Sequence, residues 1–178
     1  MIECNAIPLF PTMVLQFHVP NYTDLLPQLD KLRQQDTQGM KASNMGGWHS
    51  NYQPLPDLLA PYIPFTYTSS LAWYMVNTNL QGNYSHQHPQ NDWAGVLWLK
   101  LPPDPAQLEF EHPDCFAQYK AINSLTPELQ KQYNYYSVYA FPPKEGQMLM
   151  FPASLRHRVY FSNTDQERIA LSFNISLP

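Results

Sequence analysis

The sequence predicts a mainly β domain, folded as a sandwich or as a small barrel such as a jelly roll. Three observations predict this fold class. Short segments rich in β-branched and aromatic residues follow one another from residue 65 onward, turns separate them, and 18 prolines against 6 glycines argue against long helices. The segments are FTYTSSLAWYMVNTNL (65–80), WAGVLWLKL (93–101), LEFEH (108–112), SVYAF (137–141), GQMLMFP (146–152), HRVYF (157–161) and ERIALSFNISL (167–177).

The chain ahead of these segments is predicted to supply one strand and one helix. Residues 6–19 mix β-branched and aromatic residues with two prolines, which predicts an entry strand at a sheet edge, broken near Pro11. Thr23 is predicted to be the N-cap of a helix over residues 24–35, where leucines recur at helical spacing. Residues 37–64 are rich in turn formers and are predicted to be loops.

We expect a single domain over residues 1–178, with residues 102–140 as an insertion near the mouth of a site. The length is near the usual size of one domain, and 44% hydrophobic against 13% charged residues predict an ordered core. The insertion is rich in proline and is predicted to contain one helix, with Thr126 as N-cap and Pro127 at the first helical position. Insertions of this kind often shape binding sites.

Composition and charge argue against several classes of partner. The formal charge of −4 gives no basic field for nucleic acid, and no run of apolar residues is long enough to cross a membrane. The two cysteines, Cys4 and Cys115, form neither a disulfide framework nor a zinc motif, which is typical of a reduced, cytoplasmic protein. The surplus of aromatic residues leaves room for a homodimer contact.

A metal site is predicted from three histidines. His86 and His88 are two residues apart, so on an extended backbone both imidazoles face the same side and suit one metal ion. His157 begins a strand after the turn at Pro152 and is the candidate for a third ligand. An HxH pair alone is more often part of a polar loop, so its context decides its meaning.

That context includes Arg168, eleven residues after His157. It begins a predicted strand on which Arg168, Ala170, Ser172 and Asn174 share one face. A buried guanidinium there would bind a carboxylate through two hydrogen bonds. The alternative is a surface ion pair with a neighbouring acidic residue, Asp165 or Glu167.

Most of the chain is spanned by stretches with a shared pattern: SNMGGWHSN (43–51), AWYMVNTN (72–79), GNYSHQHPQNDWAGVLWLKLP (82–102), PKEGQMLMFPASLRHRV (143–159) and ERIALSFNISL (167–177), with LFPT near the start. These stretches resemble the iron(II)- and 2-oxoglutarate-dependent oxygenases, in particular a small branch common in bacteria and phages. The resemblance implies a double-stranded β-helix, which is a jelly roll. It also implies that His86, His88 and His157 hold iron, and that Arg168 binds the far carboxylate of 2-oxoglutarate with the help of Ser172.

The resemblance further implies the reaction and additional site residues. Asn77, Asn79 and Tyr84 lie beside the first ligands and are candidates for bonds to the cosubstrate or to the ligand rings. Enzymes of this kind use dioxygen, convert 2-oxoglutarate to succinate and hydroxylate a C–H bond, here of a small-molecule or peptide substrate. The loops 37–64 and 102–140 are expected to select that substrate.

One residue departs from the usual pattern and keeps alternatives open. The facial triad is normally written HxD or HxE, and His88 stands where the carboxylate is expected. Either the site has three histidines or a carboxylate joins from elsewhere, with Asp92, Glu109 and Glu111 as candidates. HxH also occurs in cupins, so a cupin-like metalloenzyme without 2-oxoglutarate is one alternative and a non-catalytic jelly-roll binding module is another.

Overall fold

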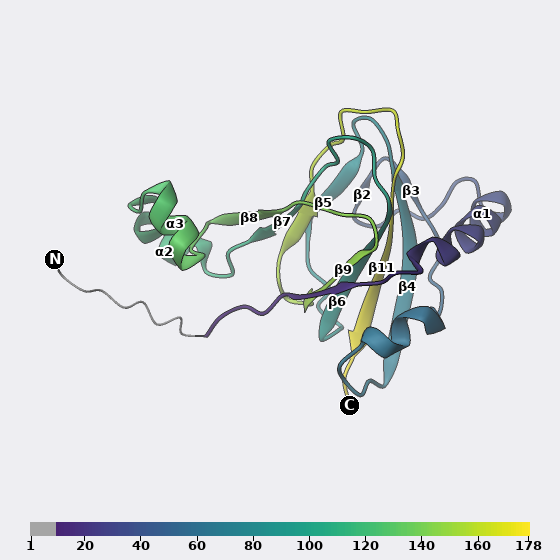
Figure 1. The fold of residues 1–178 in the computed structure, drawn as a ribbon, viewed down its shortest axis with the longest axis horizontal. Coiled ribbons are helices and arrows are strands. Elements are labelled where there is room, and N and C mark those ends of the chain that lie inside the picture. Colours follow the sequence, from purple (N-terminus) through teal and green to yellow (C-terminus); the bar gives the residue numbers. More distant parts are fainter. Residues whose placement is uncertain (1–9) are drawn as a thin grey trace.

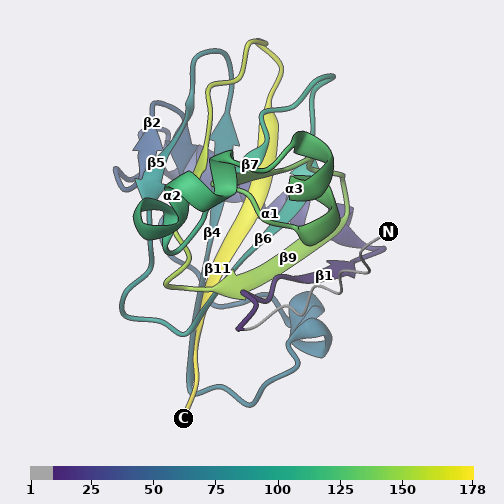
Figure 2. The same cartoon turned by 90° about the vertical axis from the view of Figure 1, so that its left-hand side faces the viewer.

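The computed structural model describes residues 10–178, which form two antiparallel sheets packed face to face (Figures 1 and 2). One sheet has six strands in the order β1-β9-β6-β11-β4-β3, and the other has five in the order β2-β5-β10-β7-β8. This arrangement confirms the predicted mainly β, jelly-roll fold. The predicted entry strand begins outside the described residues, and Cys4 also lies there.

The strands have the following bounds: β1 (Leu15–His18), β2 (Asn44–Met45), β3 (Trp48–His49), β4 (Ser69–Asn77), β5 (Gly82–His86), β6 (Trp93–Lys100), β7 (Leu108–Glu111), β8 (Val138–Phe141), β9 (Gln147–Pro152), β10 (His157–Val159) and β11 (Arg168–Ser176). The helices are α1 (Leu26–Gln35), α2 (Cys115–Asn123) and α3 (Pro127–Tyr133), with two 3-10 helices, η1 (Tyr22–Leu25) and η2 (Asp57–Tyr62). In residues 10–178 no helix combines the length and apolarity needed to cross a bilayer.

Each segment predicted as a strand contains one, and β1 lies at a sheet edge as expected. The helix predicted over 24–35 is shorter than expected, because its first residues form η1 and α1 begins at Leu26. The predicted cap is wrong, since Leu25 is the N-cap and Thr23 lies inside η1. Pro27 explains the shift, because proline is tolerated only in the first turn of an α-helix.

The insertion consists of β7, α2, α3 and β8. Its two helices project from the end of the β7–β8 hairpin, away from the sheets (Figure 1). The prediction of one helix was incomplete because α2 was missed. The predicted start of α3 is confirmed, since Thr126 is its N-cap and accepts a hydrogen bond from the backbone N–H of Leu129 at 3.4 Å.

Two apolar cores lie on opposite faces of the six-stranded sheet. The outer core includes Leu29 of α1 and Leu59 of η2, which cover that sheet from outside. The inner core lies between the sheets and includes Trp98, Phe110 and Phe151. The inner core fills only part of the space between the sheets, and the candidate site occupies space beside it.

Candidate metal centre

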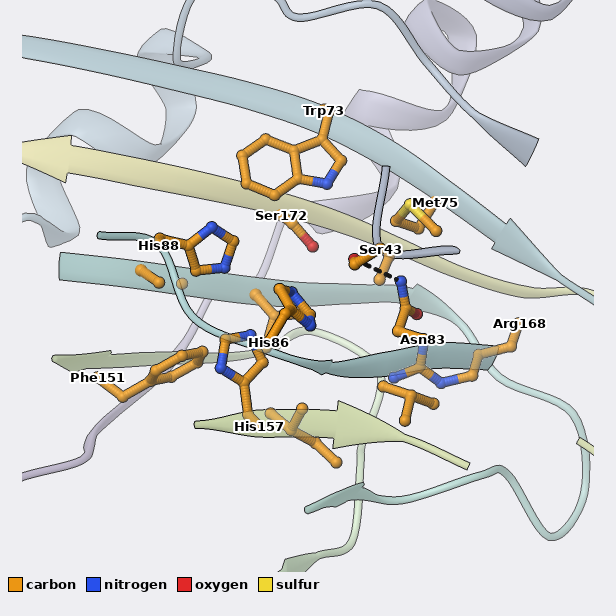
Figure 3. Close-up of a pocket in the computed structure, with 16 residues that line it drawn as sticks. Ser43, Trp73, Met75, Asn83, His86, His88, Phe151, His157, Arg168 and Ser172 are labelled. Atoms are coloured by element: carbon orange, nitrogen blue, oxygen red, sulfur yellow. Dashed lines mark hydrogen bonds between the residues drawn. The ribbon is translucent and has the colours of Figure 1, made fainter. Parts of the chain in front are cut away.

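Three histidine side chains converge between β5 and β10. His86 ends β5, His157 begins β10, and the two are direct partners in the strand register, while His88 follows two residues after His86. One possible ligand atom from each residue lies within 4.8 Å of the others. Figure 3 shows the rings grouped at one end of a pocket. The structure therefore brings together the three histidines that the sequence singled out.

Two of these rings are oriented by backbone carbonyls. Nδ1 of His86 lies 2.7 Å from the carbonyl oxygen of Tyr84, and Nδ1 of His157 lies 2.8 Å from that of Leu155. A carbonyl oxygen only accepts, so each Nδ1 carries the proton and donates it. Nε2 of both rings is then left with a free lone pair, which is the state that a metal ligand requires.

The histidine cluster is electrically neutral at physiological pH. Burial, with a smaller contribution from the neighbouring histidines, lowers the pKa of His157 to about 3. Burial followed by the nearby His86 lowers the pKa of His88 to about 4. Burial also lowers the pKa of His86. Protons therefore compete little with a metal ion for these nitrogens.

The alternative carboxylates do not join this cluster. Phe110 is the register partner of His157 and faces the inner core, so Glu109 and Glu111 on either side of it point to the opposite face of the sheet. Each candidate carboxylate is bound elsewhere: Asp92 by the N–H of Leu177, Glu109 by Arg158, and Glu111 by Ser85. Within residues 10–178 His86, His88 and His157 are the group of possible ligands that lie close enough together to hold one metal ion.

A buried cation lies at the other end of the pocket (Figure 3). Arg168 begins β11 and is 3% exposed, and its guanidinium makes no hydrogen bond or ion pair with the described part of the chain. Burial lowers its pKa to about 10, so the guanidinium stays charged at neutral pH. The alternative of a surface ion pair with Asp165 or Glu167 is wrong, because Arg168 is buried and its guanidinium pairs with neither in the described chain; Glu167 pairs with Arg33 at 2.8 Å. Nothing in the described chain neutralises Arg168.

The strand β11 connects the two ends of the pocket. Arg168, Ala170 and Ser172 line the pocket, and Asn174 on the same face contacts His88. The predicted shared face is therefore confirmed. The neighbouring strand β4 contributes Trp73, which lies over the histidine end in Figure 3.

The three other predicted residues do not line the pocket: Asn77 is buried beside it, and the other two are exposed. Asn77 is the register partner of Arg168 and is 1% exposed. Asn79 is exposed beyond the end of β4, and Tyr84 is 60% exposed, so neither lines the pocket. The irregularity in the β5–β10 pairing explains Tyr84: two residues of β5, Tyr84 and Ser85, lie opposite one residue of β10, which shifts the side-chain alternation between Asn83 and His86.

Two polar pocket residues were missed from the sequence. Asn83 and Ser43 both line the pocket, and the Asn83 side chain donates to Ser43 Oγ at 3.2 Å. Ser43 reaches the site because β2 pairs with β5, and a contact over this sequence distance leaves no local signal. Gly82 was the available hint for a close approach, since a Cβ there would lie 2.4 Å from the carbonyl oxygen of Val159 on β10.

Fold and site together describe a jelly roll whose pocket has a cluster of possible metal ligands at one end and a buried cation at the other. Comparison of sequences then identifies the family, because residues 71–174 match the family model described as "Putative 2OG-Fe(II) oxygenase". The chain belongs to this family, whose cofactors are iron(II) and 2-oxoglutarate. The histidine cluster fits the metal, and the unneutralised Arg168 fits a carboxylate. No curated protein matches the sequence.

Several solved structures share this fold, including two prolyl hydroxylases and HygX. A Pseudomonas putida prolyl-4-hydroxylase is 12% identical, with 94% of each chain covered and a TM-score of 0.62. HygX from Streptomyces hygroscopicus, solved with nickel and 2-oxoglutarate, is 10% identical, with 93% of this chain and 83% of that chain covered and a TM-score of 0.59. A Trichoplax adhaerens prolyl hydroxylase in complex with a hypoxia-inducible-factor peptide fragment is 10% identical, with 92% and 83% covered and a TM-score of 0.61. These likenesses establish the shared fold.

Proposed function

We propose that this oxygenase hydroxylates a C–H bond of a small molecule or a peptide. In this proposal His86, His88 and His157 are the iron ligands, and Arg168 binds the far carboxylate of 2-oxoglutarate. One observation carries it: a buried cation with no partner in the described chain lies in the same pocket as three neutral histidines. A desolvated charge of this kind is costly unless a ligand supplies the opposite charge.

The residues of the pocket divide the work of binding. The guanidinium of Arg168 presents parallel N–H donors that match a carboxylate, and low local polarity strengthens that attraction. Ser172 lies on the same face of β11, between Arg168 and the histidines, and its hydroxyl is the proposed second donor to 2-oxoglutarate. When bound, iron and 2-oxoglutarate supply the activation of dioxygen, with decarboxylation of 2-oxoglutarate to succinate.

The apolar walls of the pocket protect this chemistry from water. Trp73, Met75, Val96 and Phe151 line it between the two charged or polar ends. Exclusion of water favours electrostatic binding of the cosubstrate and limits side reactions. The proposed role of these residues is to orient and shield.

Support for the substrate class comes from the structural relatives. One relative is solved with a peptide fragment and another with hygromycin B, so the fold accommodates both kinds of ligand in those proteins. We propose that the loops 37–64 and 102–140 select between such substrates here. The cytoplasmic location and the homodimer contact inferred from the sequence stay predictions.

Anaerobic titration tests the cofactor roles. The protein without metal is titrated with iron(II) and then with 2-oxoglutarate, and the weak visible charge-transfer band of the chelate is recorded. We expect a band in the wild type and in Arg33→Ala, whose side chain is 40% exposed and lies outside the pocket. In Arg168→Ala we expect iron binding with the band lost at the same 2-oxoglutarate concentration, because the carboxylate loses its cation.

Other outcomes would redirect the assignment. Iron binding without a band in the wild type would contradict the role of 2-oxoglutarate and favour a cupin-like metalloenzyme. Absence of iron binding would contradict the iron site itself. Hydroxylation is tested separately, by measuring oxygen uptake and succinate release when candidate peptides and small molecules are added, with product mass increased by one oxygen atom.

A further inference from the structure

The third histidine of the cluster is held differently from the other two. The backbone carbonyls of Tyr84 and Leu155 orient His86 and His157. His88 has no such carbonyl, and the hydrogen-bond partner of its ring is the side chain of Asn174, with Nδ2 3.3 Å from Nδ1. The orientation of His88 therefore depends on a side chain that can rotate.

Asn174 is buried and incompletely bonded. It lies on β11, is 7% exposed, and its Oδ1 has no hydrogen-bond partner in the described chain. A buried amide oxygen without a donor costs free energy, so its surroundings favour any rearrangement that supplies one. The ring beside it offers such a donor when Nδ1 of His88 carries the proton.

The two arrangements of this amide correspond to two tautomers of His88. When Asn174 Nδ2 donates to Nδ1, that nitrogen must offer its lone pair, so the ring proton lies on Nε2. Nε2 then has no lone pair for a metal. A half-turn of the carboxamide about Cβ–Cγ exchanges Oδ1 with Nδ2, so that Nδ1–H donates to Oδ1 and Nε2 becomes free.

We propose that Asn174 is a positioning residue of the metal centre. Its Oδ1 accepts the Nδ1 proton of His88 when metal binds and so selects the tautomer whose Nε2 is the ligand. This inference rests on the proposed function in one respect, namely that the three histidines bind a metal. It also explains why a histidine at position 88 needs a partner that a carboxylate ligand would not. A carboxylate has no tautomers, whereas an imidazole that binds metal through Nε2 needs an acceptor for its Nδ1 proton.

Metal affinity of three variants separates the acceptor from the donor. Zinc(II) serves as the probe, with affinity measured by competition against a chromophoric chelator. Asn174→Leu removes both functions and is expected to weaken binding roughly 10- to 100-fold, the usual effect of losing such a partner. Asn174→Asp keeps the acceptor and removes the donor, so it is expected to bind at least as tightly as the wild type.

Ser176→Ala is the matched control. Ser176 lies on the same strand, and its hydroxyl donates to Asn91 outside the cluster, so its loss should leave affinity unchanged. Equal affinity of Asn174→Leu and the wild type would overturn the proposal, as would strong weakening in Asn174→Asp. Failure of the wild type to bind zinc would instead contradict the metal site of the proposed function, so the two failures are distinct.

A spectroscopic measurement keeps the test valid even if Asn174→Leu does not fold. Nitrogen-15 NMR of histidine-labelled wild type reports which ring nitrogen carries the proton. We expect His88 to be protonated at Nε2 without metal and at Nδ1 with zinc, while His86 and His157 keep their Nδ1 protons in both states. Zinc bound to Nδ1 of His88, or a His88 tautomer that does not change, would overturn the proposal.

Discussion

The two faces of the strands β4 and β11 differ in polarity and in bonding, although alternate residues of the same two strands build both. On the outer face Leu171 and Phe173 are fully buried in an apolar core against helices. On the inner face Arg168 and Asn174 are buried with polar atoms that lack partners in the described chain. Alternation along a strand thus separates residues that stabilise the fold from residues whose polar atoms are free to bind a ligand.

The largest predicted effect is loss of metal binding when a proposed iron ligand on the inner side of the pocket is replaced. We expect His86→Ala or His157→Ala to abolish binding of iron(II), because two imidazoles would remain. Metal content after reconstitution, measured by atomic emission, checks this. His88→Asp should retain the metal, since it restores the carboxylate of the usual triad. Full iron stoichiometry in both alanine variants would refute the assigned ligands.

Replacing a residue of the outer face should lower the stability of the protein and leave metal binding unchanged. Phe173 is 0% exposed and packs against Gly95, where a Cβ would come within 2.1 Å of its ring. Phe173→Ala is expected to lower the free energy of unfolding by roughly 3 to 5 kcal/mol, the usual cost of such a cavity. Urea denaturation of the metal-free protein measures it. A loss below about 1 kcal/mol would mean that the face repacks freely.

Replacing the buried cation should raise stability while it removes function. Arg168→Met fills a similar volume without a charge, so we expect the metal-free protein to gain roughly 1 to 4 kcal/mol of unfolding free energy. Binding of 2-oxoglutarate to the same variant should be lost. Denaturation and isothermal titration calorimetry give the two values. A clear loss of stability in a well-folded variant would indicate that Arg168 has a structural partner.

The smallest expected effect is at Ser172. Ser172→Ala should weaken 2-oxoglutarate binding by about 1 kcal/mol, or roughly fivefold, which is the net value of one hydrogen bond. Metal content and unfolding free energy should stay at the wild-type values, because Ser172 belongs to neither core. Calorimetric titration of the iron-loaded protein checks the affinity, and unchanged affinity would remove Ser172 from the proposed cosubstrate site.

The elements that the sequence predicted well are those that pack against a core. Most strands carry aromatic and β-branched residues at spacings that burial imposes, so each predicted segment contains a strand. The short strands β2 and β3, within the predicted loops 37–64, and β5 were not predicted. The helix α2 was missed for the opposite reason. It projects from the body and buries only Ile122, so it has no apolar stripe to detect.

Site residues that belong to a short sequence motif could be predicted. Those whose position depends on how strands pair could not. The HxH spacing and the strand of Arg168 placed both ends of the pocket. The exposure of Tyr84 depends on a local irregularity in the pairing of β5 with β10, and GNYSH contains nothing that marks it. Ser43 and Asn83 meet because two strands nearly forty residues apart pair side by side, as the register of Asn44 with Asn83 shows.

The two ends of the pocket belong to different sheets. His86 and His157 are fixed in the five-stranded sheet, and Arg168 begins a strand of the six-stranded one. The inner core, which contains Phe110 from one sheet and Phe151 from the other, therefore acts as a spacer. A change in the thickness of this core would alter the distance between the histidine cluster and Arg168. Because 2-oxoglutarate has a fixed length, core residues that contact neither iron nor 2-oxoglutarate would still affect how well it spans that distance.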